Sequence, residues 1–370
     1  MASEKRKVRA PKGAKKKKSS VRILGVILVV LLVIVLLLLG SFFLLEAKGK
    51  REMLGQKDQE VQMTVPEESE EVQIEDNGDV IYYQGERYRY NENITSILCM
   101  GIDRDSWNEG QDEIGTSGQA DFLMLAILDV ENGSVKLWNI SRDSMGEVDI
   151  YNKDGDYVRT EEAQICLAYA YGDGKESSCE NTVRSVSRLL YGMPIQSYAA
   201  VDMDVIQPLN DAVGGVEVTI HEGDILPDRF VPGTTVLLQG EDVEAYVRSR
   251  RTERPDEPID SNNNRMARQK QYMLNFVQKV LQQTKADLST PVKLYQIATE
   301  GNHVITNVGF SKISYLTTLF TNINFSEDSF QTVPGEVAEG ESYAEYHVDD
   351  EALYKMILET FYCKESGAQE

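Results

Sequence analysis

Apolar residues along this chain form one long uninterrupted run and several short ones. The long run, residues 23–45, contains no charged residue and is long enough to cross a bilayer as a helix. It is too long for the core of a cleaved signal peptide. Residues 1–22 hold ten lysines and arginines against one acid, and such a basic flank stays in the cytoplasm. The pattern predicts a single-pass cell-membrane protein whose N-terminus is cytoplasmic and whose main domain is extracytoplasmic.

The short apolar runs alternate with amphipathic segments. Residues 96–102, 122–128 and 134–140 are apolar between polar turns, which predicts strands, and the second is apolar throughout, as in a strand covered on both faces. Further strands are predicted as a hairpin over residues 80–90 and at residues 216–220. Helices are predicted at residues 161–171, 180–190, 204–212 and 353–362, with another beginning at Ser261 or Asn262. The alternation predicts a three-layer α/β/α sandwich with a central mixed sheet.

The remaining segments set the domain boundaries. Residues 46–78 are polar and acidic, which predicts a flexible spacer. Residues 79–362 are long enough for one domain with a substantial core, followed by a short tail at residues 363–370. Beyond residue 22 the chain has 28 basic and 59 acidic residues, a net charge of −31. This field repels nucleic acid and argues against a DNA- or RNA-binding role.

Cysteine and histidine give little support to a metal or triad site. There is no C-x-x-C pair, and the three histidines are scattered along the sequence. Cys166 and Cys179 flank a glycine-containing turn at residues 172–174, which suits a local disulfide in an exported domain. Cys99 falls in a predicted buried strand and is expected to be a core residue.

The most unusual polar feature is a concentration of arginine in an acidic chain. Six arginines and no lysine occur between residues 248 and 268, leading into a predicted helix: Arg248, Arg250, Arg251, Arg254, Arg265 and Arg268. Guanidinium groups match phosphate oxygens with paired hydrogen bonds, and a helix N-terminus adds N–H donors. Two interpretations are open: a phosphate or pyrophosphate site, or surface ion pairs with the neighbouring acids.

Acidic residues stand at the ends of the predicted strands. Asp103 follows one strand, Asp121 precedes the next, and Arg142 with Asp143 closes a third. Ligands of α/β sheets bind at such strand ends. Either aspartate alone suits a turn or cap, but beside an arginine cluster the pair suggests a site for Mg²⁺ (or Mn²⁺) held by carboxylates and phosphate oxygens. Arg265 and Arg268 lie beside the apolar stripe of their helix and are expected to stay available to a ligand.

Seven of these stretches, in this order, resemble the LytR-CpsA-Psr family of membrane-anchored cell-wall enzymes. They cover most of residues 95–285, and a basic tail before one membrane span is also the layout of that family. The stretches are Cys99-Met-Gly-Ile-Asp103, Ala120-Asp-Phe-Leu-Met-Leu125, Asn139-Ile-Ser-Arg-Asp-Ser144, Ala168-Tyr-Ala-Tyr-Gly172, Val213-Gly-Gly-Val216, Tyr246-Val-Arg-Ser-Arg250 and Arg265-Met-Ala-Arg-Gln269.

The resemblance implies an α/β/α enzyme that transfers a glycopolymer from undecaprenyl-pyrophosphate to peptidoglycan and releases undecaprenyl phosphate. By position, it assigns Asp103 and Asp121 as metal ligands. Asp143 could either orient Arg142 or act as a base, and the orienting role is preferred. The expected pyrophosphate contacts are Arg142, Arg248, Arg250, Arg265, Arg268 and Gln269. A diphosphate needs both a cationic cradle and a metal, so the resemblance agrees with the residue-level interpretation.

Two departures from the family pattern leave details open. Gln119 lies where many members have an arginine, and residues 260–264 replace an aspartate-rich turn. The identity of the transferred polymer is also open: it is a teichoic acid, a capsule polymer or another anionic glycan. The alternatives to a phosphotransferase are a non-catalytic protein that binds lipid-linked glycan or regulates wall synthesis, and a polyprenyl pyrophosphatase.

Overall fold

The computed structural model describes residues 41–54, 64–65, 72–75, 78–104, 118–222, 224, 226–249, 262–340 and 343–365, with the backbone alone at 262–266. Its centre is a six-stranded mixed sheet in the order β12-β9-β4-β5-β6-β13. The three strands predicted from apolar runs are confirmed and form its middle. The strands are β4 (Ile94–Ile102), β5 (Ala120–Asp129), β6 (Ser134–Ile140), β9 (Ser197–Val201), β12 (Val304–Thr306) and β13 (Phe330–Thr332).

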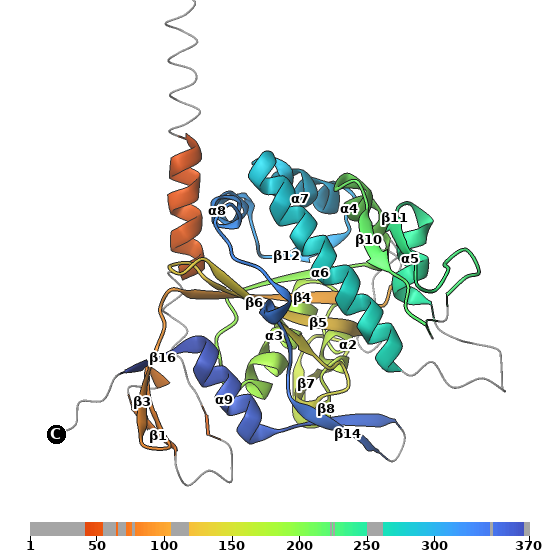
Figure 1. Ribbon diagram of the computed structural model, residues 1–370. Helices are drawn as coiled ribbons and strands as arrows, with labels where there is room; N and C mark the ends of the chain where they lie inside the picture. The colour runs from red at the N-terminus through yellow and green to blue at the C-terminus, as the bar shows by residue number, and fades with distance from the viewer. Residues whose placement is uncertain are drawn as a thin grey trace, which may run out of the picture.

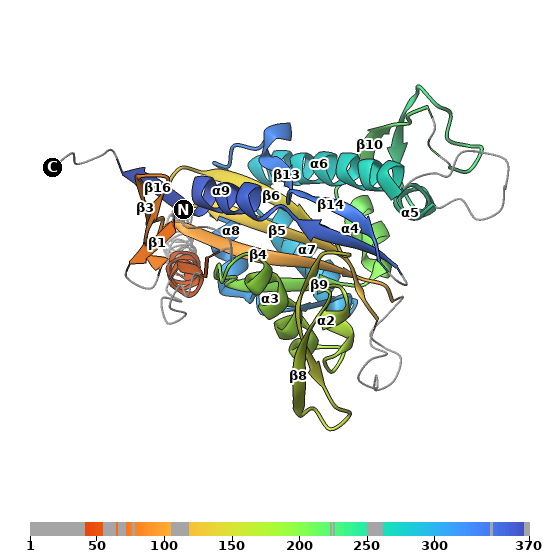
Figure 2. The ribbon, with the colours of Figure 1, turned by 90° about the horizontal axis from the view of Figure 1, so that it is seen from below.

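Helices cover both faces of this sheet, as the predicted three-layer arrangement requires (Figures 1 and 2). Alternate residues of β5 point to opposite faces: Leu123 and Leu125 join the core that contains α3 and α9, whereas Met124 and Leu128 join the core that contains α6 and α8. The helices are α2 (Leu167–Ala170), α3 (Glu176–Leu189), α4 (Ile206–Ala212), α5 (Glu241–Arg248), α6 (Asn262–Ala286), α7 (Thr290–Glu300), α8 (Phe310–Phe320) and α9 (Asp350–Phe361).

Smaller sheets surround the sandwich. The predicted hairpin at residues 80–90 is confirmed, and its turn places Gln84 and Gly85 at φ of 52° and 78°. It belongs to the sheet β1-β2-β3-β16, while β7–β8, β10–β11 and β14–β15 are separate hairpins. Their bounds are β1 (Val72–Glu75), β2 (Val80–Tyr83), β3 (Glu86–Tyr90), β7 (Met145–Tyr151), β8 (Tyr157–Gln164), β10 (Val216–Thr219), β11 (Thr235–Leu238), β14 (Gly335–Glu339), β15 (Ala344–Val348) and β16 (Tyr362–Glu365).

Three sequence predictions are wrong in this part of the fold. Residues 161–164 belong to β8 and residues 167–170 to the short α2, instead of one helix over 161–171. Residues 46–54 are helical, with Met53 fully buried, and residues 72–75 pair with β2, so these parts of the expected spacer are structured. Residues 363–365, expected in the tail, belong to β16.

The predicted disulfide is also not formed, because Cys166 and Cys179 are both buried free thiols. Cys166 follows β8, and its Sγ lies 3.9 Å from Gln119 Oε1, while Cys179 packs into the core within α3. Ser178 closes the intervening turn instead, because its Oγ accepts from Gly174 N–H and donates to Tyr169 O. Burial raises the pKa of the Cys166 thiol to about 12, which disfavours its reactive thiolate.

The predicted membrane span lies outside the described residues except for its last five. Within the stretches that the structure describes, no helix is both long and apolar enough to cross a membrane.

Candidate functional site

The aspartates predicted at strand ends meet at one edge of the central sheet. Strand β5 runs antiparallel to both β4 and β6, so the start of β5 lies between the ends of its two neighbours. Asp103 N–H donates to Gln119 O over 3.0 Å, directly beside the residues that begin β5. Asp103, Asp121 and Arg142 therefore share an edge, as the sequence predicted.

Arg142 is the centre of a small charged group at this edge. Its guanidinium forms an ion pair with Asp121, and its Nε lies 3.3 Å from Asp143 Oδ1. Burial disfavours the charged guanidinium, but the carboxylates of Asp121 and Asp143 outweigh it and raise the pKa of Arg142. All three side chains keep between 21% and 31% of their surface exposed. The group is thus fixed in place and still partly accessible from solvent.

Gln164 supports this group, although the sequence analysis did not identify it as a site residue. It is buried, and its Nε2 donates to Asp143 Oδ1 over 3.0 Å and to Ala344 O over 2.9 Å. Tyr346 N–H donates in turn to Asp143 O over 2.9 Å. Asp143 is therefore held by the β7–β8 and β14–β15 hairpins together. Its contact with Arg142 agrees with the preferred orienting role.

Arg268 occupies a different environment from the one expected. Its side chain is fully buried and is not placed to stay available to a ligand. Nε donates to Tyr246 O over 3.1 Å, one terminal nitrogen donates to Ser249 O over 2.6 Å, and the other lies 3.4 Å from Asp224 Oδ1. These contacts satisfy carbonyls at the C-terminal end of α5, where the helix leaves acceptors without intrahelical donors.

Gln269 continues the same capping arrangement, since its Nε2 donates to Val247 O over 3.3 Å. Arg248 is the last residue of α5, and its guanidinium lies 2.6 Å from Glu244 with 41% of the side chain exposed. Arg268 and Gln269 thus fix the end of the helix that carries Arg248. Arg250 and the side chain of Arg265 lie outside the described part of the chain.

The two arginine groups lie at the same end of the molecule. Figures 1 and 2 both place α5 and the first turns of α6 toward the end of the molecule at which β4 ends. Segments far apart in sequence therefore bring cationic side chains to one region.

Carboxylate oxygens at the sheet edge suit a hard cation. Asp103 is exposed and Asp121 is half-buried, and their backbones are adjacent across the β4–β5 ladder. Mg²⁺ is commonly held by one or two carboxylates together with substrate phosphates. Among the residues with described positions, no group of three or more His, Cys, Asp or Glu side chains forms a metal cluster. The donor set fits a metal that binds together with a phosphorylated substrate.

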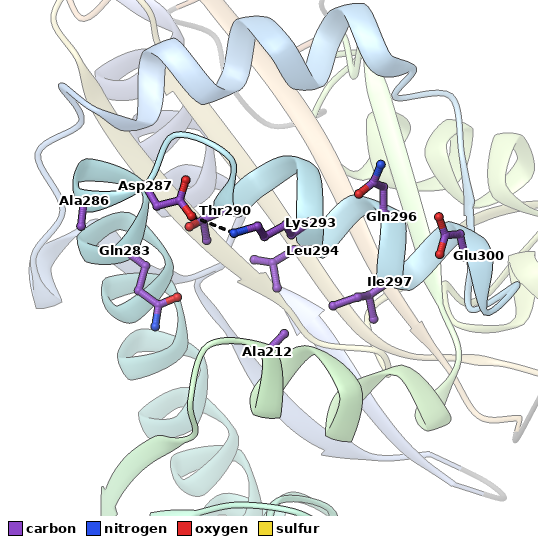
Figure 3. A pocket seen from close by; sticks show the side chains of 10 residues that line it. All are labelled: Ala212, Gln283, Ala286, Asp287, Thr290, Lys293, Leu294, Gln296, Ile297 and Glu300. Carbon is purple, nitrogen blue, oxygen red and sulfur yellow. Dashed lines mark hydrogen bonds and ion pairs between the residues drawn. The ribbon is translucent and has the colours of Figure 1, made fainter.

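A pocket of about 440 Å³ lies elsewhere, between α4, α7 and the end of α6 (Figure 3). Leu294 and Ile297 of α7 line it opposite Ala212 of α4, and Lys293 at its margin lies 2.8 Å from Asp287. None of the predicted site residues lines this pocket.

Curated relatives of this chain are named for roles in the cell wall. The chain is 27% identical to the cell wall biosynthesis protein LcpA of Corynebacterium glutamicum over 265 residues, or 65% of this chain and 50% of LcpA. It is 29% identical to TagU of Bacillus cereus, named a polyisoprenyl-teichoic acid–peptidoglycan teichoic acid transferase, over 53% of this chain and 55% of TagU. The chain thus spans about half the length of these relatives.

Solved structures share the fold. Bacillus subtilis TagV matches with a TM-score of 0.52 at 24% identity, covering 73% of this chain and 96% of TagV. The gbs0355 protein of Streptococcus agalactiae matches with a TM-score of 0.55 at 20% identity, covering 75% and 91%. The model of the LytR_cpsA_psr family matches residues 53–360, which span the central sheet and the helices on both of its faces. The chain therefore belongs to the LytR_cpsA_psr family.

Proposed function

We propose that this protein is a membrane-anchored phosphotransferase that moves a glycopolymer from a polyprenyl-pyrophosphate carrier, with undecaprenyl as the expected lipid, to peptidoglycan. Membership of the family and relatives named as teichoic acid transferases support the reaction class. The charge-free run at residues 23–45 supports the anchor.

The observation that carries the proposal is the charged group around Arg142. A guanidinium fixed by Asp143 and still partly exposed is suited to a phosphate, because it presents several N–H donors in one plane. Arg248 lies at the same end of the molecule, and its exposed guanidinium pairs with the surface carboxylate of Glu244 in its own helix. Exposed pairs of this kind are weak, so a phosphate can displace Glu244 at little cost.

In the proposed reaction a hydroxyl of the wall attacks the phosphorus that carries the glycan. A phosphodiester to the wall forms, the bond from that phosphorus to the oxygen shared with the lipid phosphate breaks, and the proton of the hydroxyl passes to solvent. Arg142 and Arg248 bind the diphosphate oxygens and offset their charge as undecaprenyl phosphate leaves. Asp143 keeps Arg142 in its position.

Asp103 and Asp121 are the side chains that would hold Mg²⁺ or Mn²⁺. When bound, the ion supplies positive charge against the diphosphate oxygens. Asp121 also faces Arg142, so the same carboxylate orders the arginine while no diphosphate is bound.

The experiment follows a labelled glycan on a polyprenyl-pyrophosphate carrier, with the full chain in vesicles and peptidoglycan as acceptor. Label on peptidoglycan supports transfer. Label released into solution indicates a pyrophosphatase instead, and label that stays on the lipid indicates a binding protein. Arg142→Met is expected to abolish transfer, whereas Arg159→Met, an exposed arginine of β8 paired with Glu161, serves as the matched control.

A further inference from the structure

Residues 41–54 are fixed to the folded domain, although the sequence suggested a flexible connection. Met53 is fully buried in the core beneath α8. Gly49 lies against the first turn of α8 so closely that a Cβ there would come within 2.0 Å of Ser311 O. Glu52 also accepts a hydrogen bond from Ser311 Oγ. The direction of this helix relative to the domain is therefore set by packing.

The apolar run ends within the same helix. Leu45, its last residue, precedes Gly49 by four positions, which is roughly 6 Å along a helix axis at 1.5 Å per residue. The first turn of α8, which contacts Gly49, must then lie about one helical turn from the end of that run. Phe310, the first residue of α8, is 48% exposed at this position.

Other apolar side chains are exposed toward the same end. Leu288, between α6 and α7, is 56% exposed. Figure 1 shows that the α6–α7 junction lies at the end of the molecule toward which residue 41 of the helix points. Phe43 and Leu44 on the helix are 62% and 74% exposed. These side chains are therefore exposed on the helix and on the end of the domain that the predicted span approaches.

Basic residues follow the apolar run after Glu46 and Ala47. Lys48, Lys50 and Arg51 are all exposed on the helix. Side chains of this kind are favoured at the level of lipid headgroups, where the ammonium and guanidinium groups meet phosphate. Exposed apolar side chains followed by basic ones are the order expected for a surface resting on a bilayer.

We propose that the start of α8 and the α6–α7 junction rest on the outer surface of the membrane, with Phe310 and Leu288 at the acyl-chain boundary. The proposal depends on the membrane anchor of the proposed function, but not on the transfer reaction. The strands of the central sheet run across the axis of the helix in Figure 1. The sheet edge that carries Arg142 then faces along the membrane surface instead of away from it.

The test uses the full chain in vesicles of phosphatidylglycerol and phosphatidylcholine, with or without brominated acyl chains. Phe310→Trp and Leu288→Trp report on the proposed surface, and Tyr157→Trp on β8 is the control. Tyr157 is 58% exposed on a hairpin at the opposite side of the molecule. The unaltered chain gives the background of its two tryptophans.

Brominated lipid is expected to reduce the added fluorescence of Phe310→Trp and Leu288→Trp about twofold, since interfacial side chains lie ~5–10 Å into the headgroup–acyl boundary. Tyr157→Trp should be unaffected. Quenching no stronger than at position 157 would overturn the proposal. So would protection of the added tryptophans from aqueous acrylamide without lipid quenching, because a second copy would then cover this face.

Flotation of the same vesicles separates the failures. A chain that does not float lacks the anchor, which removes the basis of the docking proposal. A chain that floats without lipid quenching refutes docking alone, and the glycan-transfer assay then decides the enzymatic function independently.

Discussion

Replacing Arg268 by methionine distinguishes a stabilising role from a ligand-binding role. Methionine keeps an unbranched apolar stem but loses every donor of the guanidinium. The change leaves Tyr246 O and Ser249 O without these bonds, and it leaves the buried carboxylate of Asp224 without its cation. Lysine is not equivalent, because the three contacts use three different nitrogens of one planar group.

The expected loss is large. A hydrogen bond to a charged group contributes ~1.5–3 kcal/mol, and removing one partner of a buried ion pair costs ~3–5 kcal/mol. These terms overlap, so we expect a loss of about 3–5 kcal/mol in the free energy of unfolding. That is a large fraction of the ~5–15 kcal/mol of a typical domain. The unfolding temperature should fall by on the order of 10 °C.

The assay is thermal unfolding of the full chain in mild detergent, followed by circular dichroism, beside glycan transfer. Arg248→Met is the matched control, because its side chain is 41% exposed and pairs only at the surface with Glu244. It should change stability by less than ~0.5 kcal/mol and still lose transfer. If Arg268→Met unfolds at the parent temperature but loses transfer, the stabilising role is wrong and Arg268 acts on the ligand.

Three further predictions concern the site and the β7–β8 hairpin. Gln164→Leu should lower kcat of transfer about tenfold with little change in KM, because it removes the hydrogen bond that supports Asp143. Gln296→Leu on the exposed surface of α7 is the control. Equal losses of kcat in the two variants would refute the supporting role of Gln164. A chelator should stop transfer, and added Mg²⁺ or Mn²⁺ should restore it. Asp121→Asn should raise the metal concentration required for half-maximal transfer. Transfer that persists in the chelator would exclude a role for the metal. Burial raises the pKa of Asp149, but hydrogen bonds from Arg188 and Thr160 outweigh burial, so the folded-state pKa is lowered. Ionised Asp149 therefore stabilises the fold at pH values above its unfolded pKa of about 3.9. This stabilisation is lost as the pH falls through the lower pKa of the folded state. Asp149→Asn should therefore be less stable than the parent at pH 7, and the difference in unfolding temperature should shrink below about pH 4; a difference independent of pH would contradict the linkage.

The strands were predictable because burial on both faces leaves a direct mark on sequence. Residues 122–128 are apolar throughout, and the central strand β5 contains them. The error at residues 161–164 has the opposite cause. Glu161-Glu162-Ala163-Gln164 favours a helix by intrinsic propensity, but pairing with β7 makes it a strand. Tertiary pairing of this kind is not visible in a local pattern.

The site was predictable in its residue types and less so in their positions. Strand ends indicated that Asp103, Asp121 and Arg142 would meet, because an antiparallel ladder fixes which ends are neighbours. The position of Arg268 was not predictable in this way. Its partners are mostly backbone carbonyls of α5, and a carbonyl has no signature in the sequence. Gln164 was missed for a related reason, since its segment was assigned to a helix.

The location of Arg268 changes how substitutions in the arginine-rich segment should be interpreted. The C-terminal end of a helix carries partial negative charge, so a buried guanidinium there stabilises both the helix end and itself. Arg268 and Gln269 bond to three carbonyls around Arg248, those of Tyr246, Val247 and Ser249. We therefore expect removal of Arg268 to displace Arg248 even if Arg268 contacts no ligand. Loss of activity at position 268 is evidence for a phosphate contact only when the unfolding temperature is unchanged.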